Sequence, residues 1–125
     1  MEPIYDQYGR CVGWLDDEES VIDPLGRHLA FVDEGAVFTY EGKYLGTFDE
    51  GYFRDDNGDA VAFIESAERG PLTPLPNLPP LPPMAEIPPL RPITPVPPIP
   101  PLPRLSWSGE AWDEYMQVDR RRERR

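Results

Sequence analysis

Several residue types that carry chemistry are scarce in this chain of 125 residues. Cys11 is the only cysteine, which excludes an internal disulfide and a cysteine-rich metal site. His28 is the only histidine, so a serine–histidine–aspartate triad would depend on that one side chain. The sequence also lacks a phosphate-binding glycine loop and a strip of basic and aromatic residues. It therefore predicts a protein that is not an enzyme, with no catalytic residue, no cofactor, no metal and no nucleic-acid partner.

Basic residues are scarce in the first part of the chain. Residues 1–70 hold seventeen acidic and five basic residues, whereas residues 120–125 are five arginines and Glu123. An acidic body repels nucleic acid and anionic membranes. The start resembles no signal peptide, and prolines interrupt the only long uncharged run. We expect a soluble, cytoplasmic protein with no membrane partner, and a basic tail that is either solvated or paired with an acidic surface or anionic partner.

Evenly spaced glycines mark a repeat in the first half. Gly9, Gly26, Gly42 and Gly58 follow one another at intervals of seventeen, sixteen and sixteen residues. Five positions before each glycine lies an apolar residue: Ile4, Val21, Val37 and Phe53. Four positions after it lies a small residue: Gly13, Ala30, Gly46 and Ala62. Seven positions after it lies an acid: Asp16, Asp33, Asp49 and Glu65. Glycine supplies the positive φ of a turn between two strands. Residues 1–68 are therefore predicted to be an all-β domain of four β-hairpins with pseudo-fourfold symmetry.

The small and acidic positions of the repeat carry further expectations. A small residue inside a strand indicates that another backbone or ring comes close, so these four should face a crowded place near the axis. The alternative is that they are bulge or twist positions. The closing acids are expected in solvated loops, with a symmetric carboxylate ring that binds a cation as the alternative. Residues 55–59 have the composition of a calcium loop but lack the EF-hand glycine position and distal glutamate, so they predict a turn.

One motif of the repeat has a family resemblance. Ile-Tyr-Asp-x-x-Gly-Arg at residues 4–10, followed by a small, an aromatic, an apolar and an acidic residue at 13–16, resembles the bacterial four-fold beta-flower domain. The resemblance covers roughly residues 3–66 and implies hairpin petals around a fourfold axis, with no established activity. Residues 5–10 and 22–27 also look like the YD repeats of toxin-encapsulating shells. Those shells need many more copies, and the later copies here depart from the motif at Thr39 and Asp59.

The second half contains a proline-rich run with a three-residue period. Every third residue is large and apolar, and the positions between are mostly proline. A polyproline II helix has three residues per turn, so this period places the apolar side chains on one edge. They are Leu72, Leu75, Leu78, Leu81, Met84, Ile87, Leu90, Ile93, Val96, Ile99, Leu102 and Leu105. We predict a polyproline II rod at residues 69–105 whose apolar stripe is buried on another chain or on the protein's own body.

The length of the rod suggests an assembly. At about 3.1 Å per residue the rod spans roughly 100 Å, whereas a 70-residue domain is about 30 Å across. Only the triplet Met84-Ala85-Glu86 lacks proline. The rod is therefore expected either to fold there or to reach other copies, with a semi-rigid spacer as the alternative. Its P-x-x-P matches follow from proline density alone and are weak evidence for an SH3 partner.

The residues after the rod favour a short amphipathic helix at 106–119. Ser108 would cap its start, and Trp112, Tyr115 and Met116 would share one face. A helix of about twelve residues is marginal alone. These side chains and Trp107 are therefore expected to anchor in a pocket on the body or on a neighbour, with a frayed tail as the alternative.

These features together predict a structural or adaptor protein that docks on or assembles with protein partners, as a homo-oligomer or a larger assembly. The partner-binding residues would be the rod's stripe and the anchor residues Trp107, Trp112, Tyr115 and Met116. The alternative is a module that binds a small ligand or a cell-surface group between aromatic residues around the axis, namely Trp14, Phe31 and Phe63.

Overall fold

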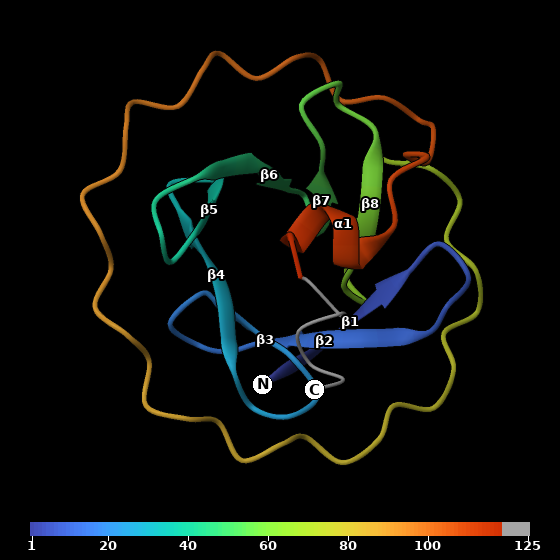
Figure 1. Cartoon of the computed structure of the whole chain (residues 1–125). Coiled ribbons are helices and arrows are strands. Elements are labelled where there is room, and N and C mark those ends of the chain that lie inside the picture. The colour runs from blue at the N-terminus through green and yellow to red at the C-terminus, as the bar shows by residue number, and fades with distance from the viewer. Residues whose placement is uncertain (119–125) are drawn as a thin grey trace.

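The first half of the chain is a closed antiparallel barrel of eight strands in the computed structural model, which describes residues 1–118 (Figure 1). The strands pair in chain order, and β1 closes on β8 at Tyr5–Phe63 and Asp6–Ala62. They are β1 (Glu2–Asp6), β2 (Cys11–Leu15), β3 (Ser20–Ile22), β4 (His28–Asp33), β5 (Ala36–Thr39), β6 (Tyr44–Asp49), β7 (Tyr52–Arg54) and β8 (Ala60–Phe63). The predicted four-hairpin all-β domain is confirmed, because each repeat is one hairpin with its glycine in the turn.

An aspartate closes the turn of the first two hairpins. Asp6 Oδ1 accepts hydrogen bonds from the N–H groups of Tyr8 and Arg10, at 2.9 and 3.0 Å. Its Oδ2 accepts from Arg10 Nε at 2.7 Å. Asp23 makes the equivalent contacts with Leu25 and Arg27. The Asp-x-x-Gly-Arg motif is therefore a self-contained turn, in which the carboxylate satisfies backbone donors and the arginine neutralises the carboxylate.

The barrel interior repeats with the hairpins and is completed by the C-terminal helix. The apolar residue five positions before each glycine is fully buried, and these residues are Ile4, Val21, Val37 and Phe53. They share one core with Trp112, Tyr115 and Met116 of α1 (Trp112–Met116), which lies within the circle of hairpins (Figure 1). The helix is thus part of the barrel's core.

The small positions of the repeat do face a crowded place. A Cβ atom on Gly46 would overlap the carbonyl oxygen of Arg54 and lie 2.9 Å from the Tyr115 hydroxyl. On Gly13 it would lie 2.9 Å from the Ile22 oxygen and 3.8 Å from the Trp112 ring. The neighbours are therefore the next strand and α1.

The C-terminal helix is shorter than the predicted span of 106–119. Ser108 does not cap it, and the N-cap is Ala111, which has no side-chain hydrogen bond. The preceding residues are extended because Ala60 N–H donates to the Ser106 oxygen at 3.0 Å and Ser108 N–H donates to the Ala60 oxygen at 2.7 Å. The predicted basic tail, 120–125, lies outside the described residues. In residues 1–118, no helix has the length and apolar character needed to cross a membrane.

Residues 71–105, called the proline belt below, run around the outside of the barrel (Figure 1). None of them belongs to a helix or a strand, and their polyproline II conformation stays a prediction. The belt neither folds back at Met84–Glu86 nor leaves the body. The prediction of a fold or an assembly from the rod's length is wrong on this point, because the belt bends around the domain and does not lie straight across it.

The belt is in register with the hairpins. Asn77, Glu86 and Arg104 donate their N–H groups to the oxygens of Gly9, Gly26 and Gly58, at 2.8, 2.9 and 3.0 Å. These donors follow a nine-residue step, which equals three turns of a three-residue helix. The step also predicts a donor at residue 95, which is proline and has no N–H. Glu86 has the N–H group that proline lacks, and this N–H holds the belt on the second hairpin.

Gly26→Ala should destabilise the protein more than Gly42→Ala, by about 1–3 kcal/mol, because of the belt. Both glycines have positive φ, +88° and +92°, so both substitutions carry similar backbone strain. A methyl group on Gly26 would overlap the Met84 oxygen, whereas on Gly42 its nearest neighbour is Pro92 Cγ at 3.7 Å. Urea unfolding of the two variants measures the difference. Equal losses would contradict the belt's position on the second hairpin.

Candidate functional site

The apolar stripe of the belt faces away from the barrel. Its twelve side chains are between 76 % and 101 % exposed, from Leu105 to Ile93. Some prolines beside them are covered instead: Pro71 is buried, and Pro74 and Pro83 are half-buried. The apolar side chains therefore point outward along the whole belt. The expectation that the protein's own body buries them is wrong.

The stripe is large for an exposed apolar surface. Burial is worth about 25 cal/mol per Å² and about 1.5–3 kcal/mol per aliphatic side chain, so each side chain offers roughly 60–120 Å² and all twelve roughly 700–1,400 Å². The largest apolar patch on a typical monomer is about 300–600 Å². Exposed apolar surface of this total size is typical of an interaction site.

The two ends of the belt meet at Arg54, which is 2 % exposed. Its Nη1 donates to the Gly58 and Arg104 oxygens at 2.7 and 2.8 Å, and Nη2 donates to the Arg69 oxygen at 3.3 Å. One guanidinium group thus binds the chain just before the belt and near its end. Arg54 is not among the site residues predicted from the sequence. The available signal was an arginine at a position where the other repeats have Tyr5, Ile22 and Phe38.

His28 ties the belt to the barrel at Glu86. Its Nε2 lies 2.7 Å from the Glu86 oxygen, and its Nδ1 lies 2.6 Å from the Ser20 hydroxyl. Because a carbonyl oxygen only accepts, Nε2 carries a proton that it donates to the Glu86 oxygen. Ser20 is 2 % exposed, whereas His28 is only half-buried.

Arg91 makes a second contact from the belt to the barrel. Its Nη2 donates to the Glu18 oxygen at 2.5 Å, and its guanidinium lies 4.8 Å from the centre of the Phe31 ring. Phe31 is 1 % exposed and packs with Phe38. A cation over an aromatic face is stabilising. Arg91 therefore fastens the belt near Pro95, which has no N–H to donate.

The predicted C-terminal anchor residues lie against the protein's own barrel. Trp107 is half-buried beside Tyr52 and Phe63, with ring centroids 6.3 and 6.0 Å away. Trp112, Tyr115 and Met116 are 2–5 % exposed in the core. The Tyr115 hydroxyl donates to the Arg54 oxygen at 2.9 Å, and burial raises the Tyr115 pKa well above its usual value. The structure thus separates these residues from the outward stripe.

The aromatic residues of the alternative ligand site do not come together. Trp14, Phe31 and Phe63 are each at most 3 % exposed. Phe31 packs in a cluster with Ala36 and Phe38, and Phe63 packs in another with Tyr5 and Tyr52. These three residues therefore form no shared pocket around the axis.

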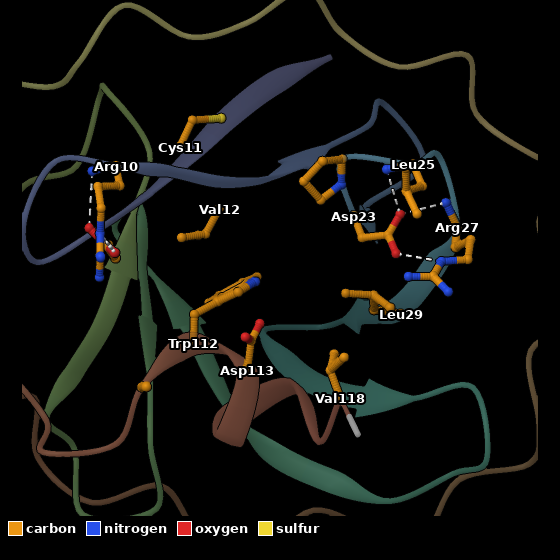
Figure 2. Close-up of a pocket in the computed structure, with 13 residues that line it drawn as sticks. Arg10, Cys11, Val12, Asp23, Leu25, Arg27, Leu29, Trp112, Asp113 and Val118 are labelled. Carbon is orange, nitrogen blue, oxygen red and sulfur yellow. Dashed lines mark hydrogen bonds and ion pairs between the residues drawn. The ribbon is translucent and has the colours of Figure 1, made fainter. Parts of the chain in front are cut away.

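A cavity of about 620 Å³ lies between the first two hairpins and α1. Figure 2 shows Arg10 with its aspartate on one side and the Asp23–Arg27 pair on the other, with Trp112 and Asp113 between them. Both aspartates hold their own turn and their own arginine. The two aspartate–arginine pairs of this cavity are thus explained by the turns that carry them.

The carboxylates considered for cation binding do not gather. Asp55 accepts from the N–H groups of Asn57 and Asp59 and from the Ser108 hydroxyl, so its oxygens serve a turn. Within residues 1–118, no three His, Cys, Asp or Glu side chains are grouped so that they could hold a metal ion. The closing acids therefore form no carboxylate ring.

A family model described as 4-fold beta flower protein matches residues 2–116. The match extends beyond residues 3–66, where the sequence motifs lie, and includes the proline belt and α1. No curated protein and no solved structure matches the chain. The matched range thus spans the hairpins, the belt and α1.

Proposed function

The chain belongs to the 4-fold beta flower protein family, and we propose that it is a structural or adaptor subunit that docks on protein partners through the stripe of its proline belt. The observation that carries this proposal is the outward exposure of twelve large apolar side chains at every third position. The aromatic C-terminal residues serve the protein's own core, so docking depends on the belt.

The belt is suited to docking because its backbone is already ordered before a partner binds. Prolines restrict the chain before it meets a partner, which lowers the conformational entropy lost on association. Contacts from Arg54, His28 and Arg91 fix the belt on the barrel. Burial of the stripe then supplies the driving force.

Site-specific photo-cross-linking tests the proposal. A photoreactive amino acid at Ile87 or Ile99, which are 92 % and 94 % exposed, should cross-link a protein partner in cells that produce the chain. The same residue at Leu25 or Tyr8, which are 72 % and 67 % exposed in hairpin turns, is the matched control. Cross-linking that is no stronger from the stripe than from the turns would overturn the proposal.

A further inference from the structure

The curvature of the belt limits what a single partner can cover. The nine-residue step divides the stripe into four quarters of three apolar residues each. A flat or convex partner meets one quarter, which offers roughly 200–400 Å². A standard interface buries about 800 Å² on each partner. One such contact is therefore weak, and several neighbours are needed to cover the stripe.

The belt is also where two copies can approach with the least repulsion. The chain has a net charge of −11, but residues 71–105 contain only Glu86, Arg91 and Arg104 as charged residues. Like-charged bodies repel through their acidic surfaces. Arg91 contacts Phe31 and the Glu18 oxygen of its own barrel. Glu86 and Arg104 are thus the belt charges available to a neighbour.

These two charges occupy equivalent places on opposite quarters. Glu86 donates its N–H to the turn of the second hairpin, and Arg104 donates to the turn of the fourth. In a closed barrel of four hairpins, the second and fourth hairpins lie across the axis from each other. Only backbone atoms of both residues make these contacts, and both residues are exposed. An acid and a base therefore lie at opposite edges of one molecule.

We propose that the partner of the stripe is a further copy of this chain, with the Glu86 quarter of one copy against the Arg104 quarter of the next; this rests on the proposed function. Leu81, Met84 and Ile87 of one copy pack against Ile99, Leu102 and Leu105 of its neighbour. The contact is heterologous, so it leaves an unpaired Glu86 quarter at one end and an unpaired Arg104 quarter at the other, and it builds open rows.

Sedimentation velocity of the full chain, from low micromolar to near-millimolar concentration, tests the row. The average sedimentation coefficient should rise with concentration without a plateau at the dimer. Glu86→Arg and Arg104→Glu should each lower the association constant about fivefold, and the double variant should restore it. Asn77→Glu is the control, since Asn77 has the equivalent position on the first hairpin. Its association constant should be unchanged.

A stripe variant completes the test. Leu81→Gln combined with Ile87→Gln should abolish association without unfolding, because both side chains are 92 % exposed. A chain that stays monomeric over the whole concentration range overturns the proposed row of copies. If photo-cross-linking then joins the stripe to a different protein, the proposed function stands and only self-association fails. Charge variants that associate like the unmodified chain overturn the pairing of Glu86 with Arg104.

Discussion

Trp112→Ala is expected to lower the free energy of unfolding by about 3–5 kcal/mol, a large part of the roughly 5–15 kcal/mol that stabilises a small domain. The side chain is 5 % exposed, and its ring lies 5.4 Å from Phe53 and 6.0 Å from Tyr115. The substitution leaves a cavity where α1 meets the barrel interior. Urea unfolding followed by far-UV circular dichroism measures the loss.

Leu25→Ala is the control for that experiment. Leu25 is 72 % exposed in a hairpin turn, so its loss should change stability by less than about 0.5 kcal/mol. Similar effects of the two substitutions would show that α1 does not contribute to the core. A large effect of Trp112→Ala also means that truncation after the hairpins removes part of the core. Docking is therefore better tested by substitutions in the stripe.

The hairpin repeat could be predicted from the sequence, but the place of the C-terminal helix could not. Glycine spacing and apolar periodicity are local patterns, and each repeat shows them independently. An amphipathic helix shows that one face must be covered without showing what covers it. The small residues Gly13 and Gly46 predicted crowding. Only the structure shows that Trp112 and Tyr115 are their neighbours.

The three-residue spacing of the stripe was predictable from the sequence, but the side to which its side chains point was not. Apolar burial favours a stripe that turns inward, whereas the structure turns it outward. Backbone donors decide the side that contacts the barrel, since Asn77, Glu86 and Arg104 bind the hairpin turns through N–H groups. Their nine-residue step is visible in the sequence. Its meaning depends on the spacing of the hairpins, which the sequence does not provide.

Departures from the repeat motif mark the docking place of the C-terminal segment. The fourth repeat has Asp59 where the first two have arginine. Asp59 accepts from the Ser106 hydroxyl, and Asp55 Oδ2 accepts from the Ser108 hydroxyl at 2.6 Å. The Ser108 hydroxyl thus donates to the Oδ2 atom that accepts from the arginine Nε in the first two turns. An arginine at residue 59 would compete with this contact.

Arg54→Met is expected to lower the free energy of unfolding by about 2–4 kcal/mol and to loosen the ends of the belt. The substitution removes the donor to the Gly58, Arg104 and Arg69 oxygens. Each hydrogen bond to a charged group contributes about 1.5–3 kcal/mol. Relief from burying a charge offsets part of that loss, and Arg54 Nε is buried without a hydrogen-bond partner. Methionine keeps much of the side-chain volume, so the effect reports mainly on the guanidinium.

Hydrogen exchange of the belt amides separates a local effect from a general one. Arg104 N–H should lose protection first, because Arg54 binds the oxygen of the same residue. Glu86 N–H should keep its protection longer, because it is held on the second hairpin beside His28. Lys43→Met removes an exposed charge from a turn and should change neither amide. Equal loss of protection at residues 86 and 104 would mean that Arg54 stabilises the barrel as a whole and does not close the belt.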